Sequence, residues 1–239
     1  MKLLTFTGVL GLALVFVAAS PVSAASKRDL VQLRVSVFNS SPVLPSTIEA
    51  GETEAGRVLM YAGIEVIWLN CPQDAPHEVS RGLCSAVSFP SHLSLQLLRS
   101  SRGLRTSTVG ISFLEHGEGC YADLFYEPIV NLQVTTHVDP SVVLGYAMAH
   151  ELGHLLLGVN SHSPSGLMRA HWTRADLANA SKGKLQFSRQ ESFRIMNRLA
   201  ARVPQDSQAY VSAKTTCTIT RTNRALATTV QTDASKNPM

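Results

Sequence analysis

Charged side chains are scarce in this protein. They make up 16% of its 239 residues, and 21 basic against 17 acidic residues leave a net charge of +4. The basic residues are scattered along the sequence and form no stripe or cluster. Because proteins that bind nucleic acids carry a concentrated basic surface, the composition argues against a nucleic-acid partner.

Long apolar runs are missing as well, with one exception near the N-terminus. Lys2 precedes an apolar segment over residues 3–19, and the small residues that follow end in Ala24. This pattern predicts a signal peptide over residues 1–24 and a secreted or periplasmic protein, with a retained N-terminal anchor as the alternative. No later stretch is long enough to span a bilayer, so we expect no stable membrane insertion after cleavage.

Cysteine is limited to four positions, Cys71, Cys84, Cys120 and Cys217. Their spacing matches no zinc ribbon, so a cysteine-rich structural zinc site is not expected. An even number of cysteines in an exported chain indicates disulfides. Three pairings are possible. Cys71 and Cys84 flank a polar loop and are the first candidate pair, which would leave Cys120 for Cys217.

The sequence contains no internal repeat, which argues against a solenoid. Residues 204–239 are rich in Thr, Ser, Ala, Gln and Asn and poor in large apolar residues, and we expect this tail to be disordered. Residues 25–203 remain as one domain, which is long enough to bury a core. We expect a monomer.

Hydrophobic periodicity predicts an α+β fold. Residues 30–38 alternate as a strand, a helix capped by Ser46 or Thr47 runs to about residue 61, and a parallel strand follows over 64–69. Three more strands are expected over 92–98, 107–114 and 121–126, the last two as a hairpin, and two more helices over 140–157 and 188–202. A mixed sheet packed on these helices is the predicted architecture.

The predicted helix over residues 140–157 carries the sequence His-Glu-Leu-Gly-His. Residues four apart share a helix face, so His150 and His154 can bind one Zn²⁺. Glu151 lies about a hundred degrees round the helix and can reach a metal-bound water without being a ligand. Two other interpretations remain open: ordinary hydrogen bonds within a buried helix, and a closed structural zinc site.

The residues after this helix supply a third candidate ligand. Gly158 stands where a helix-ending glycine would, and turn-forming residues then bring His162 back towards the helix. An exposed turn histidine is the other interpretation of His162. The alternative third ligands are His171, Asp176 and Glu191.

The motif and its turn resemble the zincin metallopeptidases and, within them, the metzincins, in which H-E-x-x-H-x-x-G-x-x-H precedes a turn containing Met. In this chain the glycine comes one residue later and the third histidine two residues later. The resemblance covers about twenty residues. It implies His150, His154 and His162 as zinc ligands, Glu151 as general base and Met168 as the methionine of the turn.

A zinc-dependent endopeptidase is the function that the resemblance implies, with a peptide or protein substrate bound under an edge strand. We expect the strand over residues 121–126 to be that edge, because extended peptides add to exposed edges. Tyr121 or Tyr126 is then a candidate oxyanion stabiliser, with plain sheet packing as the alternative. A zinc hydrolase of a non-peptide amide or ester, and a secreted zinc-binding or interaction module without catalysis, stay open.

Overall fold

The computed structural model describes residues 30–71, 84, 87–101, 103–201, 215–216 and 227–232. The predicted signal peptide lies outside these ranges. The elements are, in order, β1 (Val31–Asn39), α1 (Pro45–Tyr61), β2 (Ile64–Cys71), β3 (Ser88–Phe89), β4 (His92–Leu98), β5 (Thr108–Glu115), β6 (Glu118–Phe125), α3 (Tyr126–Thr136), α4 (Pro140–Leu157), β7 (His171–Trp172), α5 (Arg174–Ser181), α6 (Arg189–Ala200), β8 (Thr215–Thr216) and β9 (Ala227–Thr232).

The predicted α+β class with a mixed sheet is confirmed. Strand β1 pairs in parallel with both β2 and β4, and α1 forms the crossover from β1 to β2, as expected. Helix α1 begins at Pro45, one residue before the predicted caps, and Leu44 precedes it without a side-chain cap. Proline is favoured at the first helical position because its missing N–H would have no intrahelical partner there.

The central part of the sheet corrects one expectation. Strands β5 and β6 form the predicted antiparallel hairpin, but β6 lies between β5 and β4, and it pairs in parallel with β4. The strand over residues 121–126 is therefore central, and the prediction that it forms the edge was wrong. A hairpin pattern indicates that two strands are neighbours, but not which of them the rest of the sheet joins.

The side of β5 that faces away from β6 is taken by β9, which pairs with it in the antiparallel direction, and β7 follows β9 in parallel. Strand β8 pairs with β3. The composition of residues 204–239 predicted disorder, yet the described parts of this segment are strands. The backbone N–H and C=O groups of these strands pair with neighbouring strands, and the composition of the segment could not indicate that pairing.

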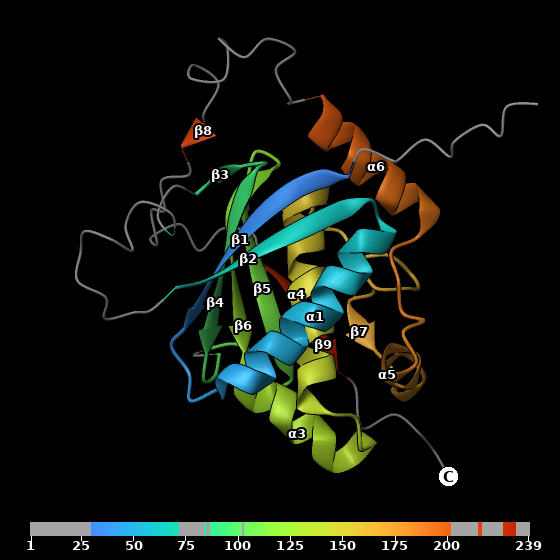
Figure 1. The fold of residues 1–239 in the computed structure, drawn as a ribbon. Coiled ribbons are helices and arrows are strands. Elements are labelled where there is room, and N and C mark those ends of the chain that lie inside the picture. Colours follow the sequence, from blue (N-terminus) through green and yellow to red (C-terminus); the bar gives the residue numbers. More distant parts are fainter. Residues whose placement is uncertain are drawn as a thin grey trace, which may run out of the picture.

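Helix α4 is the centre of the fold. Residues 143–157 are all buried, and each other helix in the described part of the chain contacts α4. Helices α1 and α4 lie side by side against the sheet (Figure 1). A helix that is apolar on all sides is a core helix, so polar side chains on α4 need partners inside the protein. No helix in the described ranges is long and apolar enough to cross a membrane.

Two helices were not predicted. Helix α3 follows β6 directly, and α5 begins with a capping box in which Thr173 and Asp176 each satisfy the other's backbone N–H. Among the cysteines, Cys71 and Cys84 form the expected disulfide. Cys120 is also disulfide-bonded; its expected partner, Cys217, lies outside the described residues.

Candidate metal centre

Both ends of α4 are fixed by the residues that the sequence indicated. The Asp139 carboxylate accepts a hydrogen bond of 2.8 Å from the backbone N–H of Ser141, and Pro140 occupies the first turn. Gly158 ends the helix with φ at +66°, and its N–H donates to the His154 carbonyl at 2.9 Å. The left-handed backbone at Gly158 turns the chain back over the helix immediately after the histidine motif.

Three histidines converge on one point. One ring nitrogen from each of His150, His154 and His162 lies within 4.8 Å of the others. The first two are fully buried, whereas His162 is half-buried and comes from the loop that follows Gly158. Three imidazoles from a helix and a returning loop form a ligand set typical of zinc.

The hydrogen bonds of His150 and His154 determine which ring nitrogen carries the proton. Nδ1 of His150 donates to the Leu167 carbonyl at 2.8 Å, and Nδ1 of His154 donates to the Val159 carbonyl at 2.9 Å. Because a carbonyl only accepts, each ring keeps its hydrogen on Nδ1 and has a bare lone pair on Nε2. The two Nε2 atoms are 2.9 Å apart, so two lone pairs face each other. A cation between the rings would satisfy both.

Two further polar atoms of the candidate residues have no partner. Nε2 of His162 and Oε1 of Glu151 are buried, and neither is hydrogen-bonded. A buried polar atom without a partner costs about 1–3 kcal/mol, and a metal ion removes that cost for an imidazole. The chemistry of the three-histidine group therefore fits Zn²⁺.

Burial keeps these histidines neutral. It lowers the pKa of His150 well below the ordinary value, and the neighbouring His154 lowers it further. Burial also lowers the pKa of His154 to about 4 and lowers the pKa of His162. Because neutral imidazole is the form that binds metals, protons compete little with a metal near neutral pH.

The carboxylate of Glu151 is held by strand β5. The hydroxyl of Ser112 lies 2.6 Å from Oε2 of Glu151 and 2.9 Å from its backbone carbonyl oxygen. On the same strand, a Cβ added to Gly110 would lie 2.5 Å from Oε1, so any larger residue here would force the Glu151 side chain to move. Burial raises the pKa of Glu151 well above its usual range.

Sequence reasoning did not single out Ser112 or Gly110. A signal was present, since the two small residues stand two apart, and therefore on one face, and their neighbours Val109, Ile111 and Phe113 are apolar. That face meets α4 at Glu151.

The alternative third ligands have other roles. The carboxylate of Glu191 accepts from the Ser188 backbone N–H at 2.7 Å and from the hydroxyl of Ser163. Asp176 caps α5 and pairs with Arg169 at 3.1 Å. His171 is exposed.

Leu167 and Met168 pack against the histidine motif from the loop that follows α4. Nε1 of Trp172 donates to the Leu167 carbonyl at 3.0 Å, and this is the oxygen that also accepts from His150. Met168 is buried, and a Cβ on Gly153 would lie 2.6 Å from its sulfur, so Met168 packs against α4 between the two histidines of the motif.

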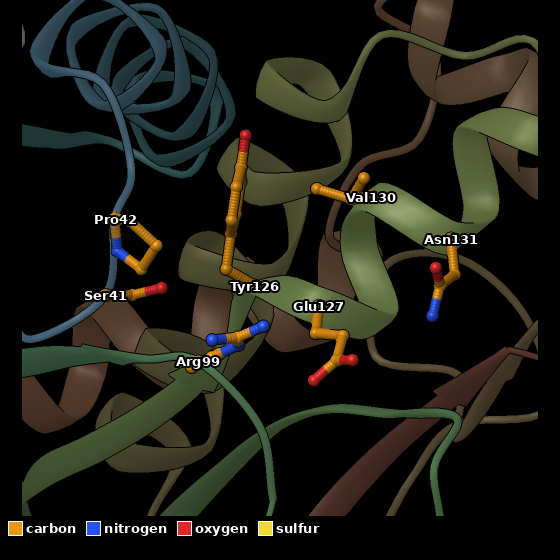
Figure 2. A pocket seen from close by; sticks show the side chains of 7 residues that line it. All are labelled: Ser41, Pro42, Arg99, Tyr126, Glu127, Val130 and Asn131. Carbon is orange, nitrogen blue, oxygen red and sulfur yellow. The ribbon is translucent and has the colours of Figure 1, made fainter.

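The two tyrosines that were candidates for stabilising an oxyanion pack against the hydrophobic core. Tyr121 and Tyr126 are partly buried against the core, and burial raises the pKa of Tyr121. Figure 2 shows Tyr126 beside a hollow of about 260 Å³ that none of the three histidines lines. This hollow, between the end of β1 and the start of α3, is separate from the metal centre. Its lining residues are Ser41, Pro42, Arg99, Tyr126, Glu127, Val130 and Asn131.

Comparison with known proteins finds resemblance among solved structures only. No protein-family model and no curated protein matches the chain. A zinc-dependent peptidase from Methanocorpusculum labreanum matches with a TM-score of 0.44 and 14% identity, over 67% of this chain and 99% of that one. Archaemetzincin from Methanopyrus kandleri matches with a TM-score of 0.42 and 18% identity, over 74% of this chain and 98% of that one.

Proposed function

We propose that the protein is a secreted zinc-dependent endopeptidase in which Glu151 is the general base. The observation that carries the proposal is the pair of bare Nε2 lone pairs of His150 and His154, 2.9 Å apart and joined by the unpartnered Nε2 of His162. Export follows from the predicted signal peptide over residues 1–24.

The three histidines would hold Zn²⁺. When bound, this ion supplies a Lewis acid that acidifies water and polarises a carbonyl. The chain supplies the proton transfers, because Oε1 of Glu151 is unpartnered while Oε2 is held by Ser112. Oε1 is therefore free to accept the proton of an attacking water and to return it to the leaving amine.

The raised pKa of Glu151 suits that role. A group that takes a proton and then returns it works best when its pKa is near the working pH, and burial moves this carboxyl upward from the range of an exposed glutamate. The substrate would be an extended peptide that pairs with the side of β5 that faces away from β6. In the structure this side is paired with β9, whereas β6 lies between β5 and β4.

The test uses the full chain and the variant Glu151→Gln, with Glu127→Gln as a matched control on the exposed side of α3. We expect one zinc per chain in all three proteins by mass spectrometry of metals. Hydrolysis of a quenched fluorescent peptide library should fall about 10²–10⁴-fold in Glu151→Gln alone.

Activity near the wild-type level in Glu151→Gln would remove the assigned base. Turnover of small amides or esters, without cleavage of any peptide, would identify a non-peptide hydrolase. A loss of zinc from His162→Ala would support His162 as third ligand, and an unchanged zinc content would place that ligand elsewhere.

A further inference from the structure

The edge of β5 is covered by the chain's own C-terminal segment. We infer that β9 is a built-in competitor that occupies the peptide-binding edge, so that the full chain binds an extended peptide only when β9 leaves. The inference rests on the proposed function, because it takes β5 as the strand with which a substrate pairs.

The register places β9 beside the residues that hold the general base. Within the antiparallel ladder, Thr228 is opposite Ser112, and Val230 is opposite Gly110. These two β5 residues are the ones in contact with the carboxylate of Glu151. A strand in this position runs directly past the catalytic carboxylate.

The other side of β9 pairs with β7, whose Trp172 contacts the proposed zinc ligand His150. Thr232 pairs with Trp172 of β7, and the Trp172 ring packs edge-on against His150 with ring centroids 5.6 Å apart. Helix α4 also contacts β9, and within the sheet β9 lies between β5 and β7. Strand β9 thus lies between β5, which contacts the proposed base Glu151, and β7, whose Trp172 packs against the proposed zinc ligand His150.

The competition follows from how strands pair. A peptide added to a sheet edge binds through its main chain, and one edge accepts one strand at a time. Because β9 belongs to the same chain, its effective concentration at the edge is on the order of millimolar. The segment Ala-Thr-Thr-Val-Gln-Thr is rich in β-branched residues and has no proline, which suits a paired strand. A free peptide at micromolar concentration would be excluded while β9 stays in place.

The test weakens the β9 ladder in the full chain. Thr229→Pro with Val230→Pro removes two consecutive N–H groups, one of which faces β5 whichever way the strand is turned. The matched control, Thr229→Ala with Val230→Ala, keeps both donors. Hydrogen exchange of the β5 amides that face β9, within residues 108–115, should be slow in the wild type and in the alanine control, and fast in the proline variant. The β5 amides that face β6 should stay slow in all three proteins.

Peptide binding is measured in the Glu151→Gln background, so that no cleavage interferes. The probe is a labelled synthetic peptide of residues 225–234, with a scrambled peptide as control. It should bind the proline variant at least about tenfold more tightly than it binds the alanine control. With Glu151 intact, kcat/KM for the peptide library should rise by a similar factor.

The outcomes separate the two proposals. Fast hydrogen exchange of the β5 amides in the wild type would overturn the inference. A proline variant whose β5 amides exchange fast but which binds the peptide no more tightly would overturn it as well. Both conclusions hold whether or not the enzyme is active. Tighter peptide binding with zinc present and no hydrolysis in any variant would support the tail as competitor for a peptide edge and remove the peptidase proposal.

Discussion

Ser112 and Glu151 are 39 residues apart in the chain, yet the serine hydroxyl lies 2.6 Å from the glutamate carboxylate, and both residues are fully buried. Strand β5 therefore fixes the side chain of Glu151, the residue of α4 that we propose as general base. Oε2 of Glu151 is hydrogen-bonded to Ser112, whereas Oε1 has no hydrogen-bond partner, and this difference can be tested directly.

Replacing Ser112 with alanine should lower the rate without releasing zinc. The Ser112 hydrogen bond lowers the pKa of Glu151 against the larger effect of burial, so its loss raises that pKa further. A base must be deprotonated to act, so the acidic limb of the pH–rate profile should move to higher pH. We expect kcat to fall about 10–100-fold with unchanged zinc content. The control is Ser94→Ala on β4, and an unmoved acidic limb in Ser112→Ala would contradict the assignment.

A methyl group at position 110 should displace the general base. A Cβ there would lie 2.5 Å from Oε1 of Glu151, whereas a Cβ on Gly56 would meet its nearest neighbour at an ordinary 3.6 Å. Gly110→Ala is expected to lose at least about tenfold in kcat, because small misplacements of a catalytic group are costly. Gly56→Ala should keep full activity. Equal activity in the two variants would show that Glu151 tolerates displacement.

Glu191 should matter for zinc affinity although it is not a ligand. Its carboxylate joins Ser163, the neighbour of His162, to the first turn of α6. Glu191→Ala should lower zinc affinity about 10–100-fold in competition with a chelator, since it frees the loop that carries His162. Ser188→Ala removes the hydroxyl that caps α6 but leaves the link to Ser163, so it should cost about 1 kcal/mol of stability and little affinity. Equal zinc affinity in Glu191→Ala and the wild type would show that the loop does not need this link.

Glu52 on α1 should give the protein a pH-dependent weakness. It is buried with Oε1 unpartnered, and burial raises its pKa against the opposing hydrogen bond from Asn70. A carboxyl with a raised folded-state pKa favours the folded protein at low pH. This contribution to the free energy of unfolding is fully present below the unfolded-state pKa. It declines as pH rises through the folded-state pKa and is absent at higher pH.

Glu52→Gln should therefore melt at a higher temperature than the wild type at pH 7, with the difference shrinking as pH falls towards 4. Thermal unfolding across that range, with the exposed Glu115→Gln as control, is the measurement. A wild type that is more stable than Glu52→Gln at pH 7 would show that the ionised carboxylate has a partner in solution.

Residues next to the ends of α4 correctly predicted where this helix begins and ends. Asp139 and Gly158 bound α4 as the sequence indicated, since capping depends on residues adjacent to the helix end. His162 was reached by the same local argument, because a glycine in the left-handed region reverses the chain soon after the motif. The structure brings these residues together, and their role as ligands remains a prediction.

Neighbour relations in the sheet could not be predicted in this way. The alternation in β6 identifies a strand but not its second neighbour, and nothing in the composition of residues 227–232 indicates that β5 will pair with them. Helix α3 follows a strand without a break and is rich in β-branched residues, which weakens its helical pattern. The role of Ser112 depends on a contact between a strand and a helix, which no window of sequence contains.

The carbonyl oxygen of Leu167 accepts hydrogen bonds from both His150 and Trp172. One main-chain atom therefore helps to orient the ring of a proposed zinc ligand and holds Trp172 on the strand that pairs with β9. Any coupling of metal binding to β9 docking through this carbonyl would be reciprocal, so each event would change the free energy of the other by the same amount.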